Sequence, residues 1–580
     1  MYRYHIRQRR NRMGETGKGH QMDREELHQN AGKQGTAKLL KGAAVLGAAA
    51  VLSKLLGTLQ KIPLQNVAGD AAFGIYNAVY PLYILILFAA TAGFPVAVSK
   101  FVAESVIHGD HREAKRIARI SGTVLLGSGI VLFVLLYLGA GEIARWIGIQ
   151  QTEKAIRSVS FALLLAPTLA VLRGYFQGYQ NMLPTAVSQV MEQLIRVITM
   201  VALLLYLAAL AYDEEWIAAG ATFGSVTGAA AGLVVMYVYW RKAMRSLNGS
   251  EEREGGSSPE AKALSTRQWV RRIAAYAIPV CLGAIVVPLL TLVDTFTMPR
   301  LLEASQGSEL EAMRQFGLYN RGLPLVQLVV MVASSMSAVL VPAMADAKAR
   351  GLTDVMRSRA EMSIRLSWLI GLGASFGLAF AAVPINIMLY KNSEASLTMA
   401  VLAFTALFST LNAVSASVLQ GAGAIHTPAQ ALLVAIVLKA LGNVVLMPRW
   451  GIEGAALSAV IAYAAAAGLN LVQLRRCTGA RFALRPYVIA PTLGVVAMGV
   501  CLAALQLLAM PAVAAWHLPE RLSASAIALV GVAGGAAVYG LALLRSGSIS
   551  REELRLMPEL DRKLAPVLAR IWPAGRSAGR

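Results

Sequence analysis

Two stretches of the chain resemble each other: Phe73-Gly-Ile-Tyr-Asn-Ala-Val-Tyr-Pro-Leu82 and Phe316-Gly-Leu-Tyr-Asn-Arg-Gly-Leu-Pro-Leu325. Six of the ten positions are identical, and the stretches lie 243 residues apart. Self-similarity of this kind points to a chain built from homologous units, and it decides the fold more than any other feature.

Two further matches share the same offset. Gln177-Gly178 corresponds to Gln420-Gly421, and each pair is followed by a proline that opens the next apolar run. The basic residue Arg196 corresponds to Lys439. Three matches at one offset predict an internal duplication.

The composition predicts a membrane protein. The chain has 580 residues, of which 56% are hydrophobic and 15% are charged, whereas soluble proteins carry about 25% charged residues. Too few polar residues are present to cover the surface of soluble domains, which excludes a soluble enzyme and a disordered protein. The three cysteines form no disulfide or metal-ligand pattern.

A membrane-spanning helix needs about 20 mostly apolar residues. Fourteen segments meet this requirement, and the chain is therefore predicted to be an all-α polytopic membrane protein. The segments are 38–59, 73–96, 118–140, 158–172, 184–211, 216–240, 273–298, 317–342, 366–388, 396–420, 428–446, 452–473, 487–510 and 523–544.

These spans divide into two lobes of six helices, at 38–240 and 271–474, and a C-terminal helix pair at 487–544. The polar remainder is a basic tail at 1–37, a linker at 241–270 and a second tail at 545–580. Because six is even, both lobes have the same topology and are related by a pseudo-twofold axis along the membrane normal. A substrate would bind between such lobes.

The net charge of +22 follows from the predicted topology. Lys and Arg number 54, of which 41 fall on one side of the membrane, in alternate loops and tails or in the first residues of the adjoining spans, and nine fall on the other side. Such an excess marks the cytoplasmic side. We therefore expect a plasma-membrane protein with both termini inside, and nucleic acid is not needed to explain the charge.

Charged residues inside the spans identify a candidate binding site. Because charges are costly within a bilayer, such residues usually face a polar cavity. Two more cations at helix ends join this group. The cationic set is Lys54, Lys61, Arg173, Arg196, Arg321 and Lys439, and the acids are Glu192 and Asp294.

The excess of positive charge favours an anionic substrate, because arginine and lysine pair well with phosphate oxygens. An alternative for Arg321 and Asp294 is that they reach the interface from helix ends. Glu192 and Arg196 lie four residues apart, so they either pair with each other or position each other for a substrate. Asp294 either pairs with a cation or helps to bind Na⁺ or H⁺.

No nucleotide-binding, metal-ligand or catalytic motif is evident, so neither a cofactor nor an enzymatic activity is expected. The driving force is left open between Na⁺, H⁺ and the membrane potential.

Five motifs carry a resemblance to a known family. They are Ser53-Lys-Leu-Leu-Gly57, Phe73-Gly-Ile-Tyr-Asn-Ala-Val-Tyr-Pro81, Ala92-Gly-Phe-Pro-Val-Ala-Val-Ser-Lys-Phe-Val-Ala-Glu104, Tyr319-Asn-Arg-Gly-Leu-Pro-Leu-Val-Gln327 and Leu340-Val-Pro-Ala343. The chain resembles the polysaccharide-biosynthesis transporters of the MOP (multidrug/oligosaccharidyl-lipid/polysaccharide) exporter superfamily. Within it, the chain is similar to the MurJ-like lipid II flippases and the stage V sporulation protein B group.

The resemblance implies a V-shaped, two-lobed flippase for undecaprenyl-diphosphate-linked peptidoglycan precursor. Its last two helices would form a groove for the lipid tail. It further implies a monomer that contacts membrane lipids and, as partners, cell-wall synthesis enzymes. Lys54 stands where the family has an arginine, and Arg321 matches the arginine of the eighth-helix motif. Gln60-Lys61 replaces the family's Arg-Asp, and the second-helix arginine is missing among residues 84–88.

Two other functions compete with this one. An ion-coupled multidrug exporter of the same superfamily would need acids in its cavity, and only Glu192 and Asp294 are available. A non-transporting scaffold for cell-wall or spore enzymes would tolerate neutralisation of the cavity charges.

Overall fold

The computed structural model describes residues 42, 44–251, 264–481, 489–515 and 519–546. Over these residues the regular secondary structure is helical and includes no strand. The N-terminal tail, the middle of the linker and the C-terminal tail beyond residue 546 lie outside the described residues.

The first half of the fold begins with a helix over residues 44–59. The elements that follow it are α2 (Lys61–Thr91), α3 (Phe94–Ile107), α4 (His111–Leu138), α5 (Ala140–Ile147), η1 (Gln150–Thr152), α6 (Glu153–Ser160), α7 (Ala162–Gly178), α8 (Leu183–Ala209) and α9 (Glu214–Glu251).

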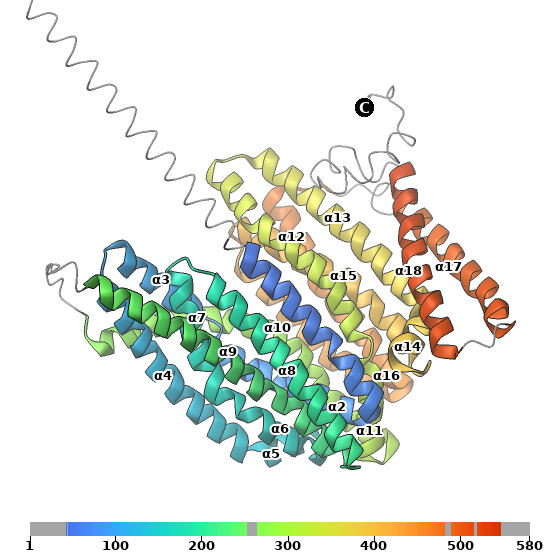
Figure 1. Cartoon of the computed structure of the whole chain (residues 1–580). Coiled ribbons are helices and arrows are strands. Elements are labelled where there is room, and N and C mark those ends of the chain that lie inside the picture. Colours follow the sequence, from blue (N-terminus) through green and yellow to red (C-terminus); the bar gives the residue numbers. More distant parts are fainter. Residues whose placement is uncertain (1–41, 43, 252–263, 482–488, 516–518, 547–580) are drawn as a thin grey trace, which may run out of the picture.

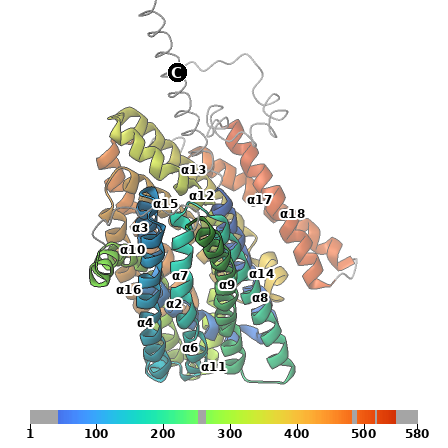
Figure 2. The same cartoon turned by 60° about the vertical axis from the view of Figure 1, so that its left-hand side comes forward.

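The second half lies beside the first, and a last helix pair follows it (Figure 1). Its helices are α10 (Thr266–Gln306), α11 (Glu309–Asn320), α12 (Leu323–Ala349), α13 (Thr353–Phe380), α14 (Ala382–Tyr390), α15 (Ser396–Gly421) and α16 (His426–Thr478). The pair is α17 (Ala490–Ala515) and α18 (Glu520–Arg545). In two views this pair lies at the edge of the molecule, against α13 and α14 (Figure 1, Figure 2).

The described residues contain 12 helical stretches that are long and apolar enough to cross a membrane. Two of these stretches, Ala44–Ile107 and His426–Thr478, each cover two of the predicted spans. The backbone breaks inside both of them, at Gly69 (φ +78°) and Gly451 (φ +54°), where only glycine adopts the left-handed region without strain. The prediction of an all-α polytopic membrane protein is therefore confirmed.

The outer surface is apolar, as a bilayer requires. Large side chains such as Leu138, Leu507 and Leu508 are about three-quarters exposed. In water such a surface would aggregate, whereas in lipid it matches its surroundings. The membrane therefore covers the faces that the helices leave unpacked.

The two halves meet where the repeated motifs cross. A Cβ added to Gly74 of α2 would lie 2.0 Å from the carbonyl oxygen of Met313, and one added to Gly317 of α11 would lie 2.0 Å from that of Asp70. Gly74 and Gly317 are equivalent positions of the repeat, and so are Asp70 and Met313. This reciprocal contact has the pseudo-twofold symmetry that the duplicated sequence predicts. Glycine is required because it lets two helix backbones approach closely.

Candidate substrate cavity

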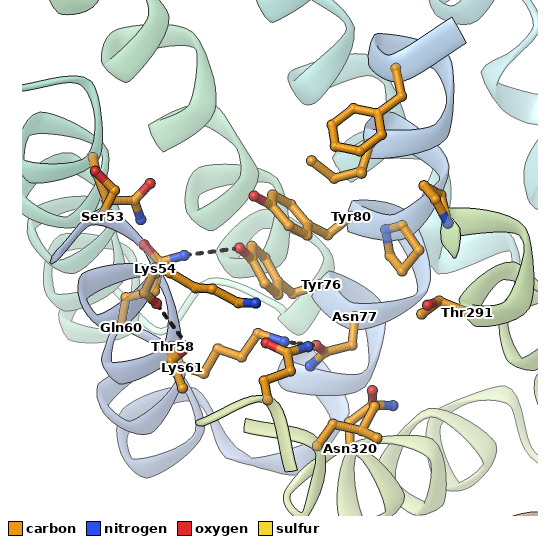
Figure 3. Close-up of a pocket in the computed structure, with 18 of the residues that line it drawn as sticks. Ser53, Lys54, Thr58, Gln60, Lys61, Tyr76, Asn77, Tyr80, Thr291 and Asn320 are labelled. Carbon is orange, nitrogen blue, oxygen red and sulfur yellow. Dashed lines mark hydrogen bonds between the residues drawn. The ribbon is translucent and has the colours of Figure 1, made fainter. Parts of the chain in front are cut away.

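A cavity of about 560 Å³ lies between the two halves. Its walls come from the helix 44–59, α2 and α8 of the first half and from α10, α11 and α12 of the second (Figure 3). Such a position between repeats is where transporters of this architecture bind substrate.

Two lysines supply the charge of the cavity. Lys54 and Lys61 are the charged members of the lining among the described residues, and no acid accompanies them there. The Lys61 ammonium donates a hydrogen bond of 3.0 Å to Asn77 Oδ1 and is largely buried (Figure 3). Lys54 is exposed and makes no ion pair within the part of the chain that the structure describes. The cavity is therefore cationic.

Neutral polar side chains make up much of the remaining lining. Tyr76 accepts a hydrogen bond of 3.3 Å from Gln60, and Asn77 and Asn320 are equivalent positions of the repeat. These groups donate and accept hydrogen bonds without adding charge. The polar lining residues are Ser53, Thr58, Gln60, Tyr76, Asn77, Tyr80, Gln189, Gln193, Thr291, Asn320 and Gln327.

A three-residue ion cluster lies behind the first-half wall. Glu192 of α8 pairs with Arg196 at 2.9 Å and with Arg173 of α7 at 2.8 Å. Arg196 also donates a hydrogen bond of 3.1 Å to the hydroxyl of Tyr80, which lines the cavity. One carboxylate thus holds two guanidinium groups, and the cluster keeps a net charge of +1 next to the cavity. Glu192 and Arg196 are in contact, which is compatible with both predicted alternatives.

Arg321 lies at the junction of the halves instead of in the cavity lining. Its guanidinium makes two hydrogen bonds to Asp70, at 2.6 and 2.8 Å, and its side chain is only 1% exposed. Asn386 and Asn392 accept from the same guanidinium, which also stacks over the Tyr390 ring. All of its N–H donors except one therefore contact protein groups, and its interaction with the Asp70 carboxylate is bidentate.

Lys439 is also buried away from the cavity lining. Its ammonium contacts Asp294 Oδ2 at 2.7 Å, and both side chains are 5% exposed. The pair joins α16 to α10 within the second half. Asp294 therefore pairs with a cation, which was one of the roles that the sequence left open for it.

An apolar groove of about 650 Å³ lies between α12, α13, α17 and α18. Its wall contains aliphatic side chains and glycines, and the hydroxyl of Tyr539 is directed to the Leu369 carbonyl oxygen at 2.9 Å. Glycine at Gly373 and Gly494 makes room for the Tyr539 ring. The groove therefore offers an almost wholly apolar surface beside the last helix pair.

Comparison with known proteins identifies the family. A family model described as polysaccharide biosynthesis protein matches residues 39–348, more than half of the chain. The chain belongs to this family. The membrane protein YabM of Bacillus subtilis (strain 168), itself uncharacterized, is 34% identical over 520 residues, which covers 89% of this chain and 94% of YabM.

Two further comparisons agree with the family. Lipid II flippase MurJ of Bacillus subtilis (strain 168) is 29% identical over 462 residues, covering 77% of this chain and 84% of MurJ. A solved structure of a lipid II flippase MurJ in an inward closed conformation aligns with a TM-score of 0.63 at 13% identity, over 86% of this chain and 98% of that one. This member of the polysaccharide biosynthesis protein family is thus a multi-pass membrane protein of the MOP exporter superfamily.

The sequence reasoning brought together six cations, whereas the structure places two of them, Lys54 and Lys61, in the cavity lining. Asp70 was not among the predicted site residues, because the predicted second span begins at residue 73 and leaves the preceding residues in a loop. In the structure α2 begins at Lys61, so Asp70 lies inside the helical segment. A signal was available, because an acid three residues before a repeated motif invites a search for its partner in the other half.

Proposed function

We propose that this polysaccharide biosynthesis family member is a flippase for a lipid-linked cell-wall precursor carried on a diphosphate, such as lipid II. It would move the precursor across the cytoplasmic membrane by alternating access of the two halves. The observation that carries the proposal is the cavity between the halves, whose charged lining residues, over the described part of the chain, are the two lysines.

The chemistry of the cavity fits such a headgroup. A diphosphate carries several negative charges and offers many acceptor oxygens, which the Lys54 and Lys61 ammonium groups can contact as point charges. Amide and hydroxyl side chains of the lining suit a sugar, whose hydroxyls both donate and accept. The net positive ion cluster around Glu192 adds a favourable field from behind the wall.

The apolar groove fits the other end of the same molecule. A polyprenyl chain needs an apolar surface that continues from the bilayer, and the groove between α12, α13, α17 and α18 provides one. We assign the tail to this groove and the diphosphate to the cavity. A soluble anion would need only the cavity.

The acids argue against cation export as the main activity. A drug antiporter needs carboxylates that release and bind cations within its cavity. In this structure Glu192 is held by two arginines and Asp294 by Lys439. The similarity to a protein named lipid II flippase supports the anionic, lipid-linked substrate instead.

Complementation of a bacterium depleted of its lipid II flippase tests the proposal. Wild-type protein should restore growth and expose the precursor to an external enzyme that cleaves it. The double variant Lys54→Gln, Lys61→Gln should lower the rate of exposure at least roughly 100-fold, since each charged hydrogen bond contributes about 1.5–3 kcal/mol and the variant loses two of them.

Lys242→Gln is the matched control, because Lys242 is an exposed lysine outside the cavity. It should flip precursor at the wild-type rate. Well-expressed wild type that restores nothing would refute the substrate class. A folded double variant that flips normally would refute the site and favour a scaffold role.

We also propose that the termini face the cytoplasm, as the distribution of Lys and Arg predicts. Cys477 provides a test, because it is exposed and follows the basic pair Arg475-Arg476, whereas Cys281 is buried. A membrane-impermeant thiol reagent should leave Cys477 unmodified in intact cells and modify it after lysis. Modification in intact cells would reverse the orientation, and Cys477→Ser identifies the signal.

A further inference from the structure

The Lys439–Asp294 pair is the most enclosed charge pair within a single half that the described residues contain. Both side chains are 5% exposed, and neither residue lines the cavity. Thr291, on the same helix as Asp294, does line the cavity. The pair therefore lies behind the second-half wall, close enough to affect it and separate from the proposed substrate contacts.

The ammonium lies among oxygen atoms. The Leu290 carbonyl accepts from it at 3.2 Å in addition to the Asp294 carboxylate, and Tyr319 donates to the same carboxylate at 3.0 Å. Asn443 donates to the other carboxylate oxygen at 3.2 Å. The Oδ1 atom of Asn443 is buried and, over the described residues, has no hydrogen-bond donor. The Asn443 Oδ1 atom therefore does not contact the ammonium, whereas the Asp294 carboxylate, a buried charge, requires a cation beside it.

The equivalent positions of the first half are arranged differently. Arg196 occupies the position equivalent to Lys439, but its acid, Glu192, is on its own helix. The position equivalent to Asp294 is Val51. In the second half the cation and the carboxylate come from different helices, α16 and α10. A positive charge at this point therefore holds two helices together.

We propose that the Lys439 ammonium occupies a monovalent-cation site formed by the Asp294 carboxylate and the Leu290 carbonyl oxygen. While the lysine side chain is present, sodium ions cannot bind at this site. The charge of the site in the second half therefore does not change during the transport cycle. Truncation of the side chain leaves an oxygen-lined space with a negative charge, and carboxylate and carbonyl oxygens are the ligands that hard cations prefer. The truncated protein should bind sodium. This proposal concerns ion binding and does not rest on the proposed function.

The proposal is tested by measuring thermal unfolding of the purified full-length protein in NaCl and in choline chloride at equal ionic strength. The wild-type Tm should be the same in both salts. Lys439→Ala should unfold at least roughly 5 °C lower in choline chloride, because it leaves a buried carboxylate unpaired. Sodium should restore at least half of that loss with a saturable dependence.

Two controls separate ion binding from a general salt effect. Lys439→Met fills the space without a charge and should not respond to sodium. Lys439→Ala combined with Asp294→Asn removes the negative charge and should also be insensitive.

Two results would overturn the proposal. The first is a folded Lys439→Ala protein whose Tm is equal in the two salts, with Lys439→Ser as the replacement if the alanine variant does not fold. The second is a wild-type Tm that rises saturably with sodium, provided that Asp294→Asn abolishes this rise.

Discussion

Replacing Arg321 with alanine should lower the free energy of unfolding by about 3–5 kcal/mol. The substitution leaves the Asp70 carboxylate buried without the bidentate partner that now binds it at 2.6 and 2.8 Å. Asn386 and Asn392 lose the donor that they share. Because Asp70 belongs to α2 and Arg321 follows α11, the loss falls on the junction of the two halves.

A double-mutant cycle with Asp70→Ala measures this interaction in purified protein. The two single variants should each be strongly destabilised, and the double variant should lose clearly less than their sum, since the residues are in direct contact. Arg449→Ala, at an exposed arginine, should change stability by no more than about 0.5 kcal/mol. If Arg321→Ala were as stable as wild type but transported nothing, Arg321 would instead be a substrate ligand.

The fold could be predicted from sequence because its determinants are local or repeated. Apolar length sets the spans, and the shared motif sets the relation between the halves. The breaks at Gly69 and Gly451 fall between predicted spans, whereas the helical backbone that continues up to each glycine was predicted as loop. Long apolar runs predict the existence of a helix more reliably than its ends.

The candidate site was harder to predict, because a charge inside a span has two ways to be stabilised. It can face a polar cavity, or it can pair with an opposite charge in the protein interior. Lys54 and Lys61 face the polar cavity, whereas Arg321 and Lys439 pair with carboxylates in the protein interior. Sequence alone does not separate them, since the partner comes from a distant helix.

The distribution of charge indicates that the paired interior cations and the cavity-lining lysines have different roles. Arg321 and Lys439 each have a nearby carboxylate and stabilise the contact between helices. Lys54 and Lys61 have no carboxylate in the lining and keep their charge available for an anionic substrate. Neutralising the first kind should lower stability, whereas neutralising the second should lower transport. The two effects can therefore be measured independently.

Alanine at Gly74 or at Gly317 should each lower the free energy of unfolding by about 3 kcal/mol or more, near the upper end for overpacking. The added Cβ would lie 2.0 Å from a carbonyl oxygen of the opposite helix, so α2 and α11 must separate by roughly 1.5 Å to reach ordinary contact. That separation would also stretch the Asp70–Arg321 pair, because the oxygen facing Gly317 belongs to Asp70 itself.

Unfolding measurements on both variants check this prediction. The precursor-exposure assay is carried out on the same preparations. Gly283→Ala is the matched control, since its Cβ would meet no atom within 4 Å and alanine favours a helix by about 1 kcal/mol over glycine. The two destabilised variants should behave alike, because the contacts at Gly74 and Gly317 are related by the pseudo-twofold axis. A large effect at only one of them would mean that the halves do not close symmetrically about this crossing.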